Sequence, residues 1–289
     1  MRFVFMVLAL LVATPVWGQT KSEEVYTPAG QWISNWAEDR CRLLREFEDG
    51  DGNQAVLYFE QYGTSPDFVL VFATDYIKQW NDRDSIALQL GEFGPRELLM
   101  QTGELGSFKG ALFLASVRPA LEDVDVELPE TDGLSGLDPS EGSRIEFVSF
   151  SSERSTVRVE TGSVEDVFAA LNKCAADLSS ARGFVDLPER QPAVQPEPRN
   201  FLDLAKTLQS AYPTEALRAG GETSLRVRLL VDAKGRVQAC EVVAMASMKF
   251  FGDLPCDIVR RSARFIAAKD EVGRPMPSIY TTTIHYQMK

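Results

Sequence analysis

The sequence predicts an α+β protein, in which a mostly β N-terminal domain closed by one helix is joined by a proline-rich connector to a smaller C-terminal domain. Three observations carry this prediction. Short apolar runs of strand length recur before residue 187, one amphipathic helix follows them, and four prolines fall within the stretch LPERQPAVQPEP at residues 187–198. We therefore expect domains at 19–187 and 199–289, with the connector at 188–198.

The N-terminal domain shows the spacing of an all-β fold. Its apolar runs are bounded by turn residues, which is typical of strands. We expect strands at 41–47, 55–62, 68–73, 85–90, 111–117, 145–150 and 156–160. This number and spacing of strands favours a sandwich or a partly open barrel.

One helix is expected at the end of this domain. Ser163 is placed to cap it, and Glu165 and Asp166 supply negative charge in its first turn. Its apolar side chains recur at helical spacing: Val167, Leu171, Cys174 and Leu178. Cys174 is therefore expected on the buried face of the helix.

The four cysteines, Cys41, Cys174, Cys240 and Cys256, are even in number, which in an exported chain favours disulfides over free thiols. Four cysteines allow three pairings. The pairing that keeps each bridge inside one domain is Cys41 with Cys174 and Cys240 with Cys256. None of them forms a C-x-x-C motif and the chain has one histidine, so we expect neither a metal site nor a cofactor.

Export is indicated by the N-terminus. Arg2 precedes an apolar run at 3–13, and Val16 and Gly18 are small residues of the kind that a signal peptidase reads. The run is shorter than the roughly 20 residues of a spanning helix. We expect residues 1–18 to be a signal peptide cleaved after Gly18, with no stable membrane insertion afterwards. An uncleaved leader that anchors the chain in the inner membrane is the alternative.

Charge differs on the two sides of the connector. Residues 21–187 hold 14 Lys and Arg against 31 Asp and Glu, whereas residues 188–289 hold 15 against 11. The acidic half would repel nucleic acid and anionic lipid, so these partners are disfavoured there. The prolines of the connector favour an extended polyproline II spacer of roughly 35 Å.

The C-terminal domain begins with helical spacing from Phe201 to Leu208. A hairpin is predicted next, with strands at 225–231 and 236–243 around the turn Asp232-Ala233-Lys234-Gly235. Pro255 opens a helix, and its predicted buried face comprises Cys256, Val259, Ala263 and Ile266. The chain closes with a strand at 278–288, in which Tyr280, Thr282, Ile284 and Tyr286 share one face.

Several of these motifs occur in an order that resembles the C-terminal domain of TonB, the energy transducer of Gram-negative bacteria. They are Tyr212-Pro213 with Ala216 and Gly220, Val231-Asp232-x-x-Gly235-x-Val237, Arg264-Phe265, Gly273-Arg274-Pro275 and the final strand. The resemblance covers about residues 205–289. It implies a ββαβ fold, a periplasmic location and the pairing of an extended peptide, such as a segment of an outer-membrane transporter, along a sheet edge.

The final strand is the expected partner-binding edge. Between Ile279 and Met288 there is no proline and no Lys, Arg, Asp or Glu, the residues that usually protect exposed edges. The residues assigned to this edge are Ile279, Thr281, Thr283, His285 and Gln287. The expected function is that of a periplasmic TonB-like protein that binds a protein or peptide by strand pairing, with a link to outer-membrane transport. The alternatives are a membrane-anchored transducer of TonB type and a hydrolase or inhibitor in the N-terminal domain.

No catalytic residues are predicted, and we expect no enzyme. His285, the sole histidine, is expected to face solvent on its strand. The stretch 48–53 lacks the spacing of a calcium loop and is expected to be a hairpin turn. Trp32 and Trp36, four residues apart, are expected to pack in the core rather than form a binding face. The acidic stretch 119–143 is the expected long loop.

Overall fold

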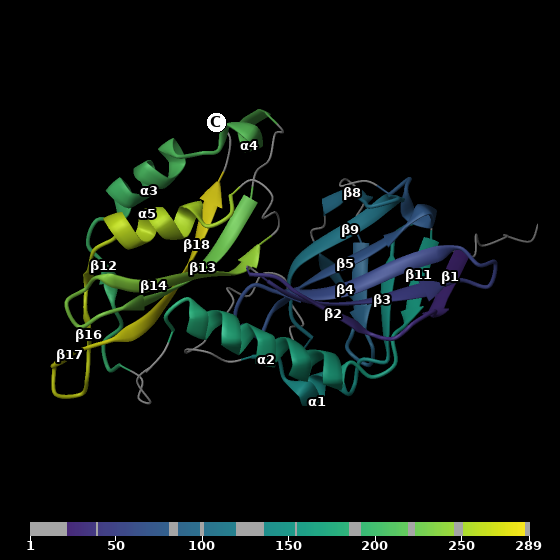
Figure 1. Ribbon diagram of the computed structural model, residues 1–289, viewed down its shortest axis with the longest axis horizontal. Coiled ribbons are helices and arrows are strands. Elements are labelled where there is room, and N and C mark those ends of the chain that lie inside the picture. The colour runs from purple at the N-terminus through teal and green to yellow at the C-terminus, as the bar shows by residue number, and fades with distance from the viewer. Residues whose placement is uncertain are drawn as a thin grey trace, which may run out of the picture.

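The computed structural model describes residues 22–38, 40–80, 86–98, 101–119, 136–153, 155–184, 192–218, 223–245 and 251–286. The expected signal peptide lies outside these residues, and so do residues 120–135 of the expected long loop. The described chain has both strands and helices, and its two large hydrophobic cores belong to two halves that lie side by side (Figure 1). The α+β class predicted from the sequence is confirmed.

The N-terminal half is a single mixed sheet in the order β7-β6-β10-β11-β1-β3-β4-β5-β9-β8, and β2 also pairs with β3. All of its pairings are antiparallel except that of β1 with β11. Its strands are β1 (Ser22–Pro28), β2 (Ile33–Trp36), β3 (Cys41–Glu48), β4 (Gln54–Gln61), β5 (Phe68–Thr74), β6 (Ile86–Leu90), β7 (Arg96–Leu98), β8 (Gln101–Leu105), β9 (Phe108–Val117), β10 (Phe147–Ser151) and β11 (Ser155–Glu160). A short 3-10 helix, η1 (Asp75–Ile77), follows β5.

The sheet folds over on itself into two layers around one core. Its two parts meet at β1, which pairs with β11 along Ser22–Tyr26 and with β3 at Thr27 and Pro28. Phe72 of β5 and Phe150 of β10 are far apart in the strand order, yet their rings stack with centroids 5.1 Å apart. One continuous sheet therefore encloses a filled core, and the mostly β character predicted for this half is confirmed.

Helix α2 (Glu165–Ala181) covers one end of this core. Phe168 meets Phe59 and Phe68 at centroid distances of 6.0 and 5.5 Å. The bridge between Cys174 of α2 and Cys41 of β3 closes 133 residues of chain. Ser163 accepts a hydrogen bond from the backbone of Glu165, although the helix itself begins one residue later than a Ser163 cap would give.

Several N-terminal elements were not predicted. Strands β1, β2, β7 and β8 carry no clean alternation of apolar residues, and β2 is exposed along its length. Because 33–36 is a strand, Trp32 and Trp36 do not share a helical face. Trp32 packs in the core against Phe59, whereas the side chain of Trp36 is exposed, so the expectation of core packing is wrong for Trp36. Within the expected long loop, Pro139–Gly142 forms a short helix, α1, because Asp138 caps it.

The C-terminal half is a three-stranded antiparallel sheet in the order β14-β13-β18, with helices on one face. Its larger elements are α3 (Phe201–Ser210), α4 (Thr214–Arg218), β13 (Thr223–Val231), β14 (Val237–Met245), α5 (Leu254–Ser262) and β18 (Ser278–Tyr286). Four two-residue strands complete it: β12 (Glu197–Pro198), β15 (Phe265–Ile266), β16 (Ala268–Lys269) and β17 (Pro275–Met276). The Cys240–Cys256 bridge ties β14 to α5.

The turn between β13 and β14 requires its glycine. Gly235 has φ of +74°, and a Cβ atom at this position would lie 2.0 Å from the carbonyl oxygen of Phe265. The carboxylate of Asp232 accepts hydrogen bonds from the backbone of Lys234 and Arg236. This turn brings the hairpin against the chain that follows α5, since Phe265 donates to the carbonyl of Gly235.

Two expectations for this half are corrected. The connector is not a free spacer at its C-terminal end. β12 pairs with β15 and Val194 pairs with Lys269, so the backbone of the connector is hydrogen-bonded to the chain that follows α5. Helix α5 ends at Ser262, and Ile266 lies in β15 with 40% of its surface exposed, so it is not part of the buried helix face. Among the described residues, no helix combines the length and apolar character needed to cross a bilayer.

A candidate partner-binding edge and groove

Strand β18 lies at one edge of the C-terminal sheet. It pairs with β13 over nine residues, from Ser278 opposite Val231 to Tyr286 opposite Thr223, and with no other strand in the described part of the chain. Its Tyr280 and Ile284 pack on the core beside α5, whereas Ile279 packs on the opposite face of the sheet. The faces predicted from the alternation are therefore the ones observed.

The direction of the backbone groups follows from the hairpin. The amide of Asp232 donates to the carbonyl of Arg236, across from β13 to β14. Because successive residues of a strand direct their backbone groups to opposite sides, Leu230 and Arg228 point toward β14, and Leu229 and Val227 point toward β18. Tyr280 pairs with Leu229 and Thr282 with Val227, so the backbone groups of Tyr280 and Thr282 hydrogen-bond to β13. The amides and carbonyls of Thr281 and Thr283 therefore point outward from the sheet.

A groove of about 520 Å³ runs beside this edge. One wall is α3, with Phe201, Leu204, Ala205 and Leu208, and the other is β18 from Thr282 to Tyr286. Leu229, Val259 and Phe265 lie between the walls. Phe201 is 58% exposed, so this wall presents apolar surface to solvent. Figure 1 shows α3 lying beyond α5 on the helical side of the sheet.

An aromatic cluster forms one end of the groove. The ring of Tyr286 lies 4.5 Å from that of Phe251 and 5.4 Å from that of Tyr212, measured between centroids. Burial, together with the nearby Tyr212, raises the pKa of Tyr286 to about 12, so its phenol is protonated at physiological pH. Its buried hydroxyl has no hydrogen-bond partner among the described residues.

Charge is sparse in the groove. Lys206 is the one charged side chain among the described residues that line it, apart from the titratable His285. Lys206 is 80% exposed and lies 4.0 Å from Asp203 on the same helix. The lining is otherwise apolar or made of neutral hydroxyl and amide groups. Such a site favours an extended, mainly apolar segment over a charged one.

The sequence-predicted edge residues lie in one row. Ile279, Thr281, Thr283 and His285 all belong to β18, and Thr283 and His285 are exposed. Gln287 lies outside the described residues. The groove wall formed by α3 was not predicted. The helical spacing from Phe201 to Leu208 predicted the helix, but Phe201 remains 58% exposed and lines the groove.

The other sequence candidates fall elsewhere. The 48–53 stretch is a hairpin turn, in which the carboxylate of Asp49 accepts backbone hydrogen bonds from Asp51 and Asn53, as expected. These hydrogen bonds help to lower the pKa of Asp49, against the effect of burial. No cluster of His, Cys, Asp or Glu that could hold a metal ion is found within the described ranges.

Comparison with known families agrees with this geometry. Residues 209–288 match the family model of the Gram-negative bacterial TonB protein C-terminal, so this part of the chain is similar to that domain. The match begins near the end of α3, which leaves Phe201, Leu204, Ala205 and Leu208 outside it. No curated protein and no solved structure matches the chain.

Proposed function

We propose that the chain is a periplasmic interaction protein of TonB type, which captures an extended segment of a partner protein by pairing it with β18. The observation that carries this proposal is the combination of an edge strand without charge or proline and an apolar groove directly beside it. The family match supports the broader statement that the domain serves protein interaction or transport in the Gram-negative envelope.

Strand addition uses both parts of this site. The outward backbone groups of Thr281 and Thr283 would hydrogen-bond to the partner, which gives affinity with little dependence on its sequence. Alternate side chains of the partner would enter the groove between β18 and α3 and contact apolar surface such as that of Phe201. A partner segment with alternating apolar residues therefore fits best. In this proposal the domain binds and does not catalyse.

The proposed partner is a segment of an outer-membrane transporter, and the proposed location is the periplasm. Both follow from the TonB-type domain, and the two disulfides suit an oxidising compartment. Intact-mass measurement of the protein from the cell envelope tests the leader, and a mature chain beginning at Gln19 is expected. Recovery of the full-length chain in the inner membrane would support the anchored transducer instead.

The pairing itself is tested by Thr283→Pro. Since the amide of Thr283 points away from β13, proline removes a donor to the partner without breaking the sheet. We expect partner capture from envelope extracts to be lost while the circular dichroism spectrum is unchanged. Thr283→Val is the matched control, because valine keeps the amide and suits a strand. Capture that survives in the folded proline variant would contradict strand pairing at β18.

A further inference from the structure

Charged side chains are buried on the sheet face that lies opposite α5. Arg228 of β13 is 3% exposed and Glu241 of β14 is 1% exposed. This burial lowers the pKa of Arg228 from its usual value by desolvation. A three-stranded sheet standing alone would leave this face in solvent. What buries it is the N-terminal half of the chain.

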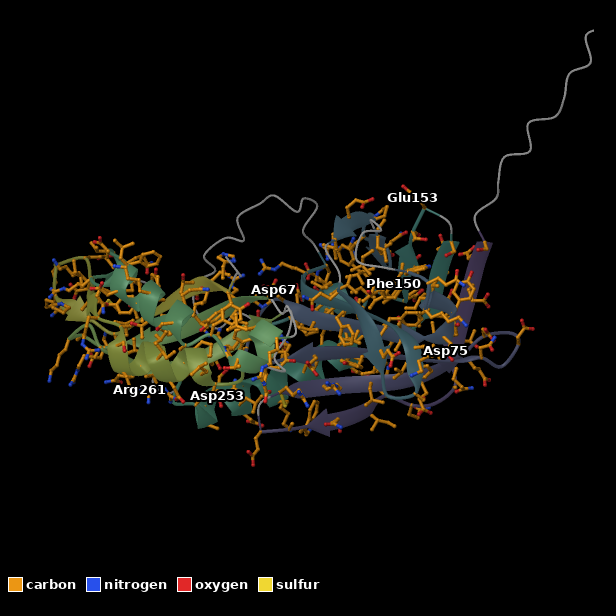
Figure 2. The ribbon with its side chains drawn as sticks, turned by 90° about the horizontal axis from the view of Figure 1, so that it is seen from above. Asp67, Asp75, Phe150, Glu153, Asp253 and Arg261 are labelled. Atoms are coloured by element: carbon orange, nitrogen blue, oxygen red, sulfur yellow. A yellow bond between two sulfur atoms is a disulfide. The ribbon has the colours of Figure 1, made fainter. Side chains whose placement is uncertain are left out.

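The first contact is centred on Asp67, whose side chain is fully buried. Its carboxylate lies 2.6 Å from Arg118 and 3.3 Å from Arg226 of β13. Asp67 directly precedes β5 and Arg118 directly follows β9, so both come from the same end of the N-terminal sheet. Figure 2 shows Asp67 where the two halves of the molecule meet.

The second contact is centred on Glu241. Its carboxylate accepts a hydrogen bond of 2.8 Å from Arg228 and one of 2.9 Å from the hydroxyl of Ser179, near the C-terminal end of α2. Arg182 lies 3.8 Å from the same carboxylate and also donates to the carbonyl of Tyr62. Because Ser179 receives a bond from the amide of Thr64, the loop between β4 and β5 is tied into this contact.

Apolar packing accompanies the two charged contacts. Phe184, which follows α2, packs with Leu230 of β13, Ala239 of β14 and Ile279 of β18. In addition, β14 lies next to β5 and β9 of the N-terminal sheet. The N-terminal half therefore covers one face of the C-terminal sheet and also stands beside its β14 edge.

We infer that the N-terminal β unit is a built-in partner of the TonB-type sheet, held there by the buried clusters around Asp67 and Glu241. It packs beside β14 and leaves β18 with β13 as its strand partner in the described part of the chain. The two halves therefore unfold as one cooperative body. This inference goes beyond the proposed capture of a peptide and does not depend on it.

The experiment is differential scanning calorimetry of the full chain and of the Asp67→Asn/Glu241→Gln variant. Both substitutions keep the shape of the side chain and leave the arginines buried without a carboxylate, which is strongly destabilising. The wild-type chain should unfold in one transition. In the variant we expect the first transition to fall by about 5 °C or more and to separate from the second. Glu92→Gln, which breaks an exposed pair with Arg144, is the matched control and should leave the profile unchanged.

Two independent transitions in the wild-type chain would overturn the inference, as would a double variant that keeps the wild-type profile. If the double variant does not fold, Asp67→Asn alone is measured by amide hydrogen exchange. Faster exchange in both β13 and residues 62–67 supports the inference, and a change confined to residues 62–67 contradicts it. Since no partner is added in either measurement, a failure here is distinct from a failure of peptide capture.

Discussion

The two outer strands of the C-terminal sheet, β14 and β18, have different surroundings. β14 carries the buried Glu241, is bridged to α5 through Cys240 and stands beside the N-terminal sheet. β18 carries no charged residue from Ile279 onward, apart from the titratable His285, and borders an apolar groove. Natural sheets protect exposed edges with charge, proline or a covering element. Here β14 lies next to the N-terminal sheet, whereas β18 borders the groove, and this difference supports the proposed binding at β18.

This contrast separates stability from binding. Changes on the β14 side remove buried contacts, so they should lower the free energy of unfolding. Changes along β18 and α3 remove exposed groups, so they should weaken partner capture and leave the fold intact.

The largest effect is expected from removing the bridge that holds β14 against α5. Replacing both Cys240 and Cys256 with alanine opens a bridge across 16 residues. By the loop-entropy model this costs about 3 kcal/mol of stability. Urea unfolding of the oxidised wild-type and variant chains measures the difference. A loss of unfolding free energy below about 1 kcal/mol would show that contacts with the N-terminal half, and not the disulfide, mainly hold β14 in place.

A smaller effect, on binding alone, is expected from Phe201→Ser. Phe201 lines the groove and is 58% exposed, so its loss should weaken partner capture by about tenfold, while stability changes by no more than about 0.5 kcal/mol. Leu202→Ser is the matched control, because Leu202 is 71% exposed on the same helix but does not line the groove. Titration of the captured partner segment gives both affinities. Equal losses in the two variants would mean that general surface apolarity, and not the groove, determines binding.

Much of the fold could be predicted from the sequence, because its strongest signals are local. Periodic apolar residues predicted α2, and the Asp232–Gly235 turn predicted the β13–β14 hairpin. The exposed β2 and the short β7 and β8 could not be predicted, because their own residues show no apolar alternation, although each pairs with a strand adjacent to it in the chain.

The candidate site was predicted in part for the same reason. The edge residues from Ile279 to His285 follow from the absence of charge and proline in one short segment. The groove could not be predicted, because it depends on how α3 is placed against β18. The burial of Arg228 and Glu241 and the partial burial of Arg226 could not be predicted either. Alternating charges on a hairpin are typical of a solvated face, and only tertiary contact with Asp67 and α2 removes these side chains from water.

The most direct test of the account compares the two outer strands in the full-length chain within cells. A photoreactive amino acid replaces either His285 on β18 or Gln238 on β14, both of which are exposed. After irradiation, we predict a cross-linked outer-membrane protein from position 285 and none from position 238, with the product at 285 lost when Thr283→Pro is added. Cross-linking of the same protein from position 238, or from position 285 regardless of Thr283→Pro, would contradict the claim that β18 is the edge that captures the partner.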